Sequence, residues 1–318
     1  HANDATSGTA YMTINGLDQG FETDSDQTTM ELTPAGMNFT GDMTNQQVYY
    51  GLYGYGATHS ISFTNIQVTG CCACADPVYV DDDYAGSTPG DIVDGHTYAY
   101  DAFDTIQDGI DAVCECGTVY VNPGLYEESI YTVGKSLKLL APSGATIKCP
   151  STSHNVYVAE STQLYEYCIG LFGGSYNSGN DTVYGSDDIT VELSGFTIDA
   201  DNHPPADRWS SILCRNVNTN NCDGLASIHD NELINIDVDG KETFGILGYG
   251  DMDIVIENNL VDQFGSGGIG MYSGYSEILG NTVIGNRTTT WATNGIQLGY
   301  GAYGLISGNE VTECGWPG

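Results

Sequence analysis

Ten cysteines are the residues of this chain with the most evident chemistry. Five of them form two dense groups, Cys71-Cys72-Ala73-Cys74 and Cys114-Glu115-Cys116. These thiols could bind a soft metal ion, although zinc sites usually show a Cys-x-x-Cys spacing. An even number of cysteines instead favours disulfides and an oxidising compartment. We therefore expect disulfides between the two groups, with a metal site or interchain bonds as the alternatives. The ten disulfide candidates are Cys71, Cys72, Cys74, Cys114, Cys116, Cys149, Cys168, Cys214, Cys222 and Cys314.

Clustered acids near a basic residue could transfer protons, which is the second chemistry that the residue types allow. Pairs of carboxylates arise easily by chance, however, because the chain has 42 acidic residues. We therefore expect a solvated acidic loop here and keep a catalytic site as the weaker alternative. The members of that weak catalytic candidate are Asp187, Asp188, Asp199, Asp201 and Arg208.

Three consecutive acids, Asp81, Asp82 and Asp83, could supply oxygen ligands to a hard cation. Their like charges would otherwise repel one another, so we consider a Ca²⁺ site at this position. The six histidines share no spacing that would indicate a transition-metal site. We therefore expect the chain to use no cofactor, with Ca²⁺ at this triplet as the weaker alternative.

The charge balance narrows the range of partners. A formal net charge of −35 would repel nucleic acid and anionic lipid, so we expect neither as a partner. No stretch approaches the roughly 18 apolar residues of a membrane span. Glycosylation sequons begin at Asn38, Asn180 and Asn286, and they agree with the cysteines in predicting an extracellular protein at the cell surface.

A helix and then short strands must position these groups. Ile106, Ile110 and Val113 recur at helical spacing, which predicts an amphipathic helix within residues 103–113. After it, Val119 and Val121 alternate with polar neighbours in the manner of a half-buried strand.

Later segments repeat. ELSGFTI, IHDNELI, IENNLVD, ILGNTVI and ISGNEVT place Gly195 and then four asparagines at intervals of 36, 28, 22 and 28 residues. Such a repeat predicts stacked coils with inward Ile side chains. We expect each asparagine to occupy a left-handed bend and to hydrogen-bond the asparagine of the next coil. The four ladder asparagines are Asn231, Asn259, Asn281 and Asn309.

The order TIQDGIDAV, GTVYVNPGLYEESI and SLKLLAPSGATI resembles the start of a pectate-lyase-like right-handed parallel β-helix. The preceding VYVDDDYAGSTPG is similar to the lead-in of such helices in archaeal cell-surface proteins. VYYGLYGYGATHSISFTNIQVTG resembles the last strands of a concanavalin-like jelly roll. The expected fold is all-β: a partial β-sandwich in 1–70, a cysteine-rich linker in 71–77 and a parallel β-helix in 78–318, with its capping helix at 103–113.

Proteins of this fold carry out several kinds of chemistry, so the function of this chain must be inferred from its residues. A lyase on this fold would need a free Lys or Arg as base, and the chain has only seven cations. A polygalacturonase-type hydrolase would show GHG and RIK motifs, which the sequence lacks. We therefore expect a structural protein that polymerises with itself into a sheath, surface layer or filament. The alternative is a polysaccharide-binding or polysaccharide-degrading protein, with Tyr49, Tyr50, Tyr53 and Tyr55 as a platform.

Overall fold

The computed structural model divides the chain into two compact units, residues 1–73 and 74–318. In the first unit the structure describes two antiparallel pairs: β1 (Ala2–Asp4) with β2 (Thr9–Ala10), and β3 (Thr13–Ile14) with β4 (Leu17–Asp18). The rest of the predicted partial β-sandwich lies outside the described residues, as do its tyrosines, Cys71 and Cys72. In the second unit the described residues are 74–161, 163–201, 203, 207–222, 224, 226–237, 241–286 and 294–315.

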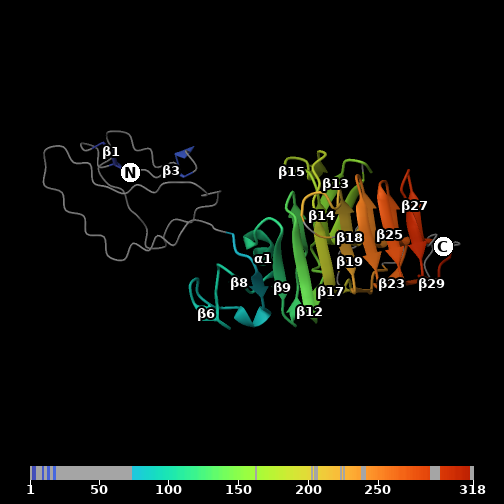
Figure 1. The fold of residues 1–318 in the computed structure, drawn as a ribbon, viewed down its shortest axis with the longest axis horizontal. Coiled ribbons are helices and arrows are strands. Elements are labelled where there is room, and N and C mark those ends of the chain that lie inside the picture. Colours follow the sequence, from blue (N-terminus) through green and yellow to red (C-terminus); the bar gives the residue numbers. More distant parts are fainter. Residues whose placement is uncertain are drawn as a thin grey trace. The chain divides into compact units, whose positions relative to one another are not determined.

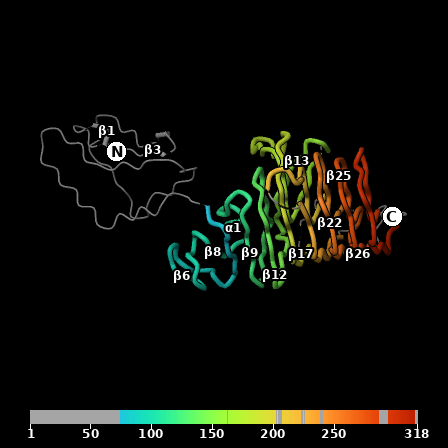
Figure 2. Tube along the Cα trace, in the orientation of Figure 1, coloured from blue at the N-terminus to red at the C-terminus, as the bar shows by residue number. Residues whose placement is uncertain are grey.

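The second unit is all-β, and most of its strands form two long sheets (Figure 1). A separate antiparallel pair is formed by β6 (Ile92–Val93) and β7 (His96–Thr97). Three strands make up a typical coil. Two belong to a 14-stranded sheet and meet at a bend, and the third belongs to a 9-stranded sheet. Strands at equivalent places in successive coils pair in parallel, and the coils follow one another along the stack in chain order (Figure 2). This connectivity is compatible with a parallel β-helix.

The strands of the 14-stranded sheet before the bend are β5 (Val78–Val80), β8 (Ala102–Phe103), β9 (Gly117–Val121), the first parts of β12 (Leu137–Lys148) and β17 (Val191–Asp199), β19 (Ser227–His229), β22 (Asp253–Glu257), β25 (Tyr275–Leu279) and β28 (Tyr303–Ser307). After the bend come β10 (Leu125–Tyr126), the second parts of β12 and β17, β20 (Glu232–Ile234), β23 (Leu260–Phe264), β26 (Thr282–Gly285) and β29 (Glu310–Thr312). The 9-stranded sheet contains β11 (Ile130–Val133), β13 (His154–Val158), β14 (Leu164–Phe172), β15 (Ser175–Asn177), β16 (Thr182–Tyr184), β18 (Arg208–Arg215), β21 (Glu242–Tyr249), β24 (Gly267–Tyr272) and β27 (Asn294–Gly299).

Apolar side chains in register fill the inside of the stack. Leu193, Ile228, Ile256 and Ile278 occupy equivalent positions in four successive coils, and each is fully buried. Burial of one such side chain contributes about 2 kcal/mol relative to exposure. The core is therefore one continuous column, as the repeated Ile positions predict, but Ile306 of the last repeat is 46% exposed and the prediction is wrong there.

An asparagine ladder runs along the bend. Asn231 Nδ2 donates to Asn259 Oδ1 at 3.0 Å, Asn259 Nδ2 to Asn281 Oδ1 at 3.0 Å, and Asn281 Nδ2 to Asn309 Oδ1 at 2.9 Å. Each acceptor oxygen also takes the backbone N–H of the preceding asparagine, at 2.8 to 3.1 Å. The predicted ladder is confirmed.

The left-handed backbone of the bend lies one residue earlier than predicted. Asp230 and Asn258 have φ of 55°, and Gly280 and Gly308 have φ of 62° and 69°. The residue before each ladder asparagine therefore turns the chain, which leaves the asparagine amide pointing along the stack. The expectation that the ladder asparagines themselves are left-handed is wrong, and of the five repeat positions only Gly195, with φ of 85°, behaves that way.

The capping helix α1 spans Ile106–Ala112, which is shorter than the predicted 103–113. Phe103 belongs to β8 and not to the helix. The helix begins after its N-cap, Thr105, whose hydroxyl oxygen accepts the Asp108 N–H. At the other end, Val113 is an extended C-cap. Among the described residues, no helix is both long and apolar enough to cross a bilayer.

Two charged side chains fasten α1 to the first coils. The Glu128 carboxylate accepts the N–H groups of Ile106 and Gln107 at 2.8 and 3.0 Å. Lys135 Nζ donates to the carbonyl oxygens of Ile110, Asp111 and Val113 at 2.9 to 3.0 Å. Both ends of the short helix are thus satisfied by residues of the stack, with charges that complement its dipole.

The chain leaves the stack on both sides of β14, and this excursion, made of β13 with the turn after it and of the antiparallel pair β15–β16, covers part of the outer face of the 9-stranded sheet. Its strands β13, β15 and β16 extend that sheet beyond β14. Val156, Val158 and Val183 of the excursion join a second apolar cluster with Leu213 and Leu247 of the coils. A buried Arg215 holds this excursion, because its guanidinium donates to Glu160 and to the carbonyl oxygens of Gly173 and Gly185.

Candidate functional site

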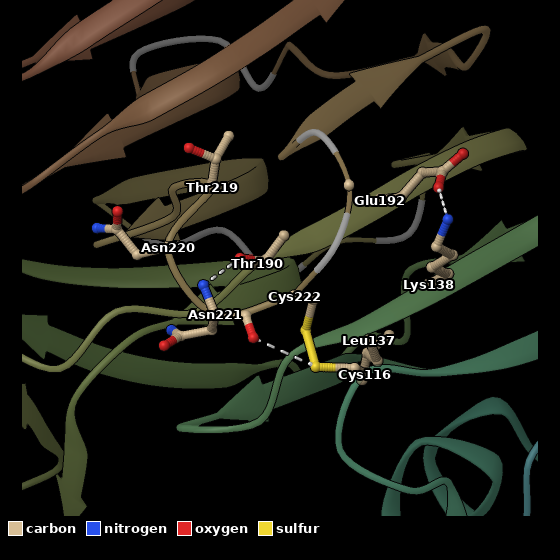
Figure 3. A pocket seen from close by; sticks show the side chains of 10 residues that line it. Cys116, Leu137, Lys138, Thr190, Glu192, Thr219, Asn220, Asn221 and Cys222 are labelled. Atoms are coloured by element: carbon tan, nitrogen blue, oxygen red, sulfur yellow. Dashed lines mark hydrogen bonds and ion pairs between the residues drawn. A yellow bond between two sulfur atoms is a disulfide. The ribbon is translucent and has the colours of Figure 1, made fainter.

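A polar groove of about 490 Å³ lies where the loop of residues 216–226, between β18 and β19, approaches β12 and β17 (Figure 3). The strands contribute one side of it and the loop contributes the other. Hydroxyl, amide, ammonium and carboxylate groups dominate the lining. The lining residues are Cys116, Leu137, Lys138, Thr190, Glu192, Thr219, Asn220, Asn221, Cys222 and Gly224.

Hydrogen bonds hold the loop in place beside β17. Thr190 Oγ1 donates to the Asn218 carbonyl at 2.7 Å and accepts the Asn221 N–H at 3.2 Å. Asn220 Nδ2 donates to Asp188 Oδ2 at 3.1 Å, and Asn221 Nδ2 donates to the Asp188 carbonyl. The groove is therefore preorganised by contacts between two coils.

A row of three ionisable side chains crosses three successive coils at the groove. Lys138 Nζ lies 2.9 Å from Glu192 Oε2, and His229 Nε2 lies 3.4 Å from Glu192 Oε1. Burial raises the pKa of Glu192, but the hydrogen bonds and charges of Lys138 and His229 outweigh burial and hold the pKa below its ordinary value. Glu192 is thus ionised at neutral pH and pairs with its two neighbours.

Acid should remove the stabilisation that this row provides. Because the folded-state pKa of Glu192 is lowered, its contribution is present above the ordinary carboxyl pKa and is lost as pH falls through the folded value. We expect Glu192→Gln to lower the free energy of unfolding by about 0.2 to 1 kcal/mol near neutral pH, as for other partly exposed pairs. Denaturant titrations of both proteins from about pH 7 to pH 3 measure this difference, which should shrink as the pH falls below the ordinary glutamate pKa of about 4.3. A difference that stays constant with pH would contradict the assignment.

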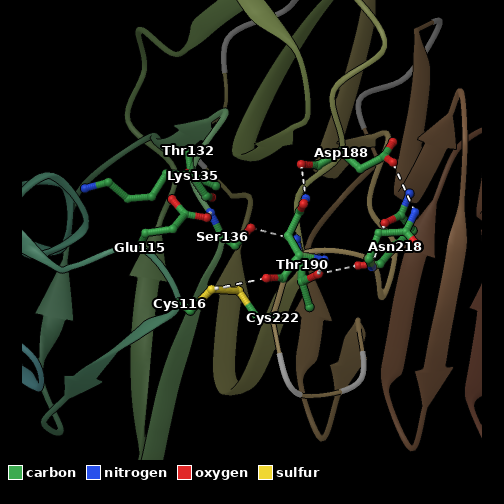
Figure 4. Close-up of a disulfide and its surroundings, with 11 residues drawn as sticks. Glu115, Cys116, Thr132, Lys135, Ser136, Asp188, Thr190, Asn218 and Cys222 are labelled. Atoms are coloured by element: carbon green, nitrogen blue, oxygen red, sulfur yellow. Dashed lines mark hydrogen bonds between the residues drawn. A yellow bond between two sulfur atoms is a disulfide. The ribbon is translucent and has the colours of Figure 1, made fainter.

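The Cys116–Cys222 disulfide joins the loop to the start of the first coil (Figure 4). Cys116 Sγ also lies 3.7 Å from the Asn221 carbonyl oxygen. Beside it, Glu115 Oε1 accepts the Ser136 N–H at 3.0 Å, and Ser136 Oγ accepts the Thr190 N–H at 3.0 Å. A continuous set of contacts therefore connects the disulfide with β17.

Among the cysteines that the structure describes, two further disulfides lie outside the groove. Cys74 is bonded to Cys114, so the linker is fastened to the end of the capping helix, and Cys149 is bonded to Cys168 within the core. Three disulfides indicate a protein of an oxidising, extracytoplasmic compartment.

Cys214 departs from the expectation that every cysteine is a disulfide candidate. Its thiol is free and fully buried. Burial raises the pKa of this thiol. Cys214 packs in the core as a small apolar side chain. Cys314 places its Sγ 3.3 Å from the Thr312 carbonyl oxygen.

The weak catalytic candidate is distributed over separate contacts. Asp187 and Asp188 precede β17, whereas Asp199 is its last residue. Asp199 Oδ1 accepts the Asp201 N–H and Asn235 Nδ2, at 3.0 and 2.9 Å. Arg208 Nε instead pairs with Glu242 Oε2 at 2.6 Å. Because β17 has nine residues, the acids at its two ends are spread along the strand, while Arg208 is engaged elsewhere.

The triplet of Asp81, Asp82 and Asp83 has carboxylate oxygens within 4.8 Å of one another. Asp81 caps the short 3₁₀ helix η1 (Asp82–Tyr84) through the Asp83 N–H, and its second oxygen accepts Asn122 Nδ2 at 2.9 Å. Asp82 Oδ2 accepts the Leu125 N–H at 3.1 Å. Two of the three acids therefore tie η1 to the turn after β9.

The sequons differ in their surroundings. Asn38 lies outside the described residues, and Asn180 is exposed in the turn between β15 and β16. Asn286 is partly buried and its Nδ2 donates to Asp237 Oδ2 at 2.7 Å. Asn180 is thus the described sequon most open to a glycan, and modification there stays a prediction.

Sequence reasoning missed the groove and the roles of Lys135 and Arg215. Lysine and arginine at these positions follow no motif, and their partners are backbone carbonyls or a distant glutamate. The pairing of Lys138 with Glu192 could have been found once the register of β12 on β17 was known, because the two residues are direct neighbours across these strands.

No protein-family model, curated protein or solved structure matches this chain.

Proposed function

We propose that the chain is a building block of an extracellular assembly, such as a sheath, surface layer or filament, and that its second unit is a right-handed parallel β-helix of the pectate-lyase-like kind. The observation that carries this proposal is the use of the cations. Five of the seven hold the fold together, so they are not available as the free base that a lyase needs. These five are Lys135, Lys138, Arg208, Arg215 and Lys241.

The reinforcement of the stack supports the same conclusion. The ladder, the Cys74–Cys114 and Cys116–Cys222 disulfides and the satisfied capping helix stabilise contacts between coils, and the Cys149–Cys168 disulfide closes one coil. A stack built in this way suits a durable rod that repeats in an assembly with copies of itself.

Electron microscopy of the purified protein, at rising concentration and with or without divalent cations, tests the proposal. Regular tubes, sheets or fibres are the expected result. A protein that stays monomeric and releases unsaturated products from acidic polysaccharides would contradict it.

A polysaccharide-binding role is the second candidate, because the groove offers hydroxyl and amide groups from both of its sides. Asn221 and Thr219 would hydrogen-bond sugar hydroxyls, and the fixed loop would keep the ordering cost low. Binding of soluble polysaccharides by the wild type but not by Asn221→Ala would favour this role.

Ca²⁺ at the acidic triplet is a further part of the proposal. We expect Ca²⁺ to raise the melting temperature by a few degrees and EDTA to reverse the change, because the ion would screen three adjacent carboxylates. Asp83→Asn is the informative variant, since Asp81 and Asp82 also hold backbone and side-chain donors. Equal responses to Ca²⁺ in the wild type and Asp83→Asn would exclude this site.

A further inference from the structure

We propose that the Cys116–Cys222 disulfide masks a soft-metal site that forms when the bond is reduced. The two sulfur atoms and a carboxylate oxygen of Glu115 all lie within 4.8 Å of one another. Two thiolates and one carboxylate are a ligand set that suits Zn²⁺. This site lies at the edge of the groove, because Cys116 and Cys222 are among the groove's lining residues, and the inference does not depend on assembly.

The disulfide is open to a reductant. Cys116 and Glu115 are exposed and Cys222 is partly exposed, whereas Cys149 and Cys168 are fully buried. Thiol–disulfide exchange depends on such access. A small dithiol would therefore reach this bond before the core disulfide.

The dithiol supplies the two electrons that reduce the disulfide, and the metal ion replaces the two thiol protons. One thiolate of the reductant attacks a disulfide sulfur, and its second thiol then releases the mixed disulfide. The reductant becomes a cyclic disulfide, and Cys116 and Cys222 become thiols. Zn²⁺ then displaces their two protons and binds both thiolates without changing its own oxidation state.

The geometry needs only a local movement. Two thiolates on one tetrahedral zinc lie roughly 3.8 Å apart, given Zn–S distances of about 2.3 Å, so the sulfurs must separate by about 2 Å. The loop that carries Cys222 can supply this movement once the covalent bond is gone. Glu115 Oε1 is held by the Ser136 N–H, which fixes the carboxylate and leaves Oε2 to face the metal. Water or the Asn221 carbonyl oxygen would complete the coordination.

In this state the metal replaces the disulfide as the tie between the loop and the first coil. The chain would then keep its groove under reducing conditions when zinc is present and loosen it when zinc is absent. Zinc binding and reduction of the disulfide are therefore coupled. We expect zinc to stabilise the reduced protein and not the oxidised one.

The test uses the full chain, reduced with dithiothreitol and desalted under argon, and then titrated with Co²⁺ and Zn²⁺. Reduced wild type should bind one Co²⁺ more than reduced Cys116→Ser/Cys222→Ser, with the absorption of a tetrahedral thiolate site. All other thiols are common to both proteins, including Cys71, Cys72, Cys74 and Cys114. Equal stoichiometry in the two proteins would overturn the proposal.

Glu115→Gln keeps the disulfide and an oxygen that can accept the Ser136 N–H, so it provides a second variant that should fold. We expect its affinity for the extra metal ion to fall by at least about tenfold. Zn²⁺ should raise the melting temperature of the reduced wild type more than that of reduced Glu115→Gln. Unchanged affinity in this variant would overturn the three-ligand site.

Discussion

Replacing Cys116 and Cys222 together by serine is expected to lower the free energy of unfolding by about 4 to 5 kcal/mol. The two residues are 106 positions apart, so the bond removes the conformational entropy of a very long loop from the unfolded chain. Because the bond lies at the surface and not in the core, the substitution leaves little cavity. Denaturant unfolding of the oxidised proteins measures the loss.

The Cys74–Cys114 disulfide provides the matched comparison, since it closes a loop of only 40 residues and also involves an exposed cysteine. Its double serine variant should lose about 1 kcal/mol less, because the entropic contribution grows with the logarithm of loop length. A larger loss from this shorter loop would contradict the chain-entropy explanation, as would a loss below about 2 kcal/mol from the Cys116–Cys222 pair.

Asn259→Leu is expected to cost about 3 to 5 kcal/mol. Asn259 is 1% exposed, and its Oδ1 accepts both the backbone N–H and the Nδ2 of Asn231. Its own Nδ2 donates to the Ile228 carbonyl and to Asn281 Oδ1. Leucine would leave several buried polar groups without partners, each costing about 1 to 3 kcal/mol, and it would gain only modest apolar contact. Urea unfolding followed by tyrosine fluorescence reports the change.

Asn258→Gly is the control for that variant, because it changes the neighbouring asparagine without touching the ladder. Asn258 is exposed and has φ of 55°, a conformation that glycine adopts at the equivalent positions Gly280 and Gly308. We expect a change of less than about 0.5 kcal/mol. Similar losses in both variants would show that the bend, and not the hydrogen-bond ladder, is the source of the stability.

Much of the fold could be predicted from local patterns. Ile106 and Ile110 indicated the capping helix, and the alternation at Val119 and Val121 indicated the first long strand. The repeats indicated both the inward Ile column and the asparagine ladder. These features share one cause. Every coil contacts its neighbours through the same few positions, so the residue types at those positions recur at regular intervals in the sequence.

Other features depend on contacts that have no period. Bonding of Cys116 to Cys222 requires the loop of residues 216–226 to reach back across β12 and β17, and nothing in the spacing of the cysteines specifies it. Arg215 and Glu160 meet because the excursion around β14, which carries Glu160 in the turn after β13, folds over one sheet. The shift of the left-handed residue by one position depends on backbone geometry at the bend.

Composition and repeats thus determined the all-β class, the stack of coils, the ladder and the oxidising compartment, because each of these follows from residue types or nearest-neighbour spacing. The tertiary structure alone decided the groove, the row of Lys138, Glu192 and His229, and the grouping of Glu115 with a disulfide. The physical reason is that the register of parallel strands brings the row together, and the loop that carries Cys222 brings that residue to Cys116 and Glu115 from a distant coil. Contacts of that kind depend on where the chain folds back in space, which no local pattern encodes.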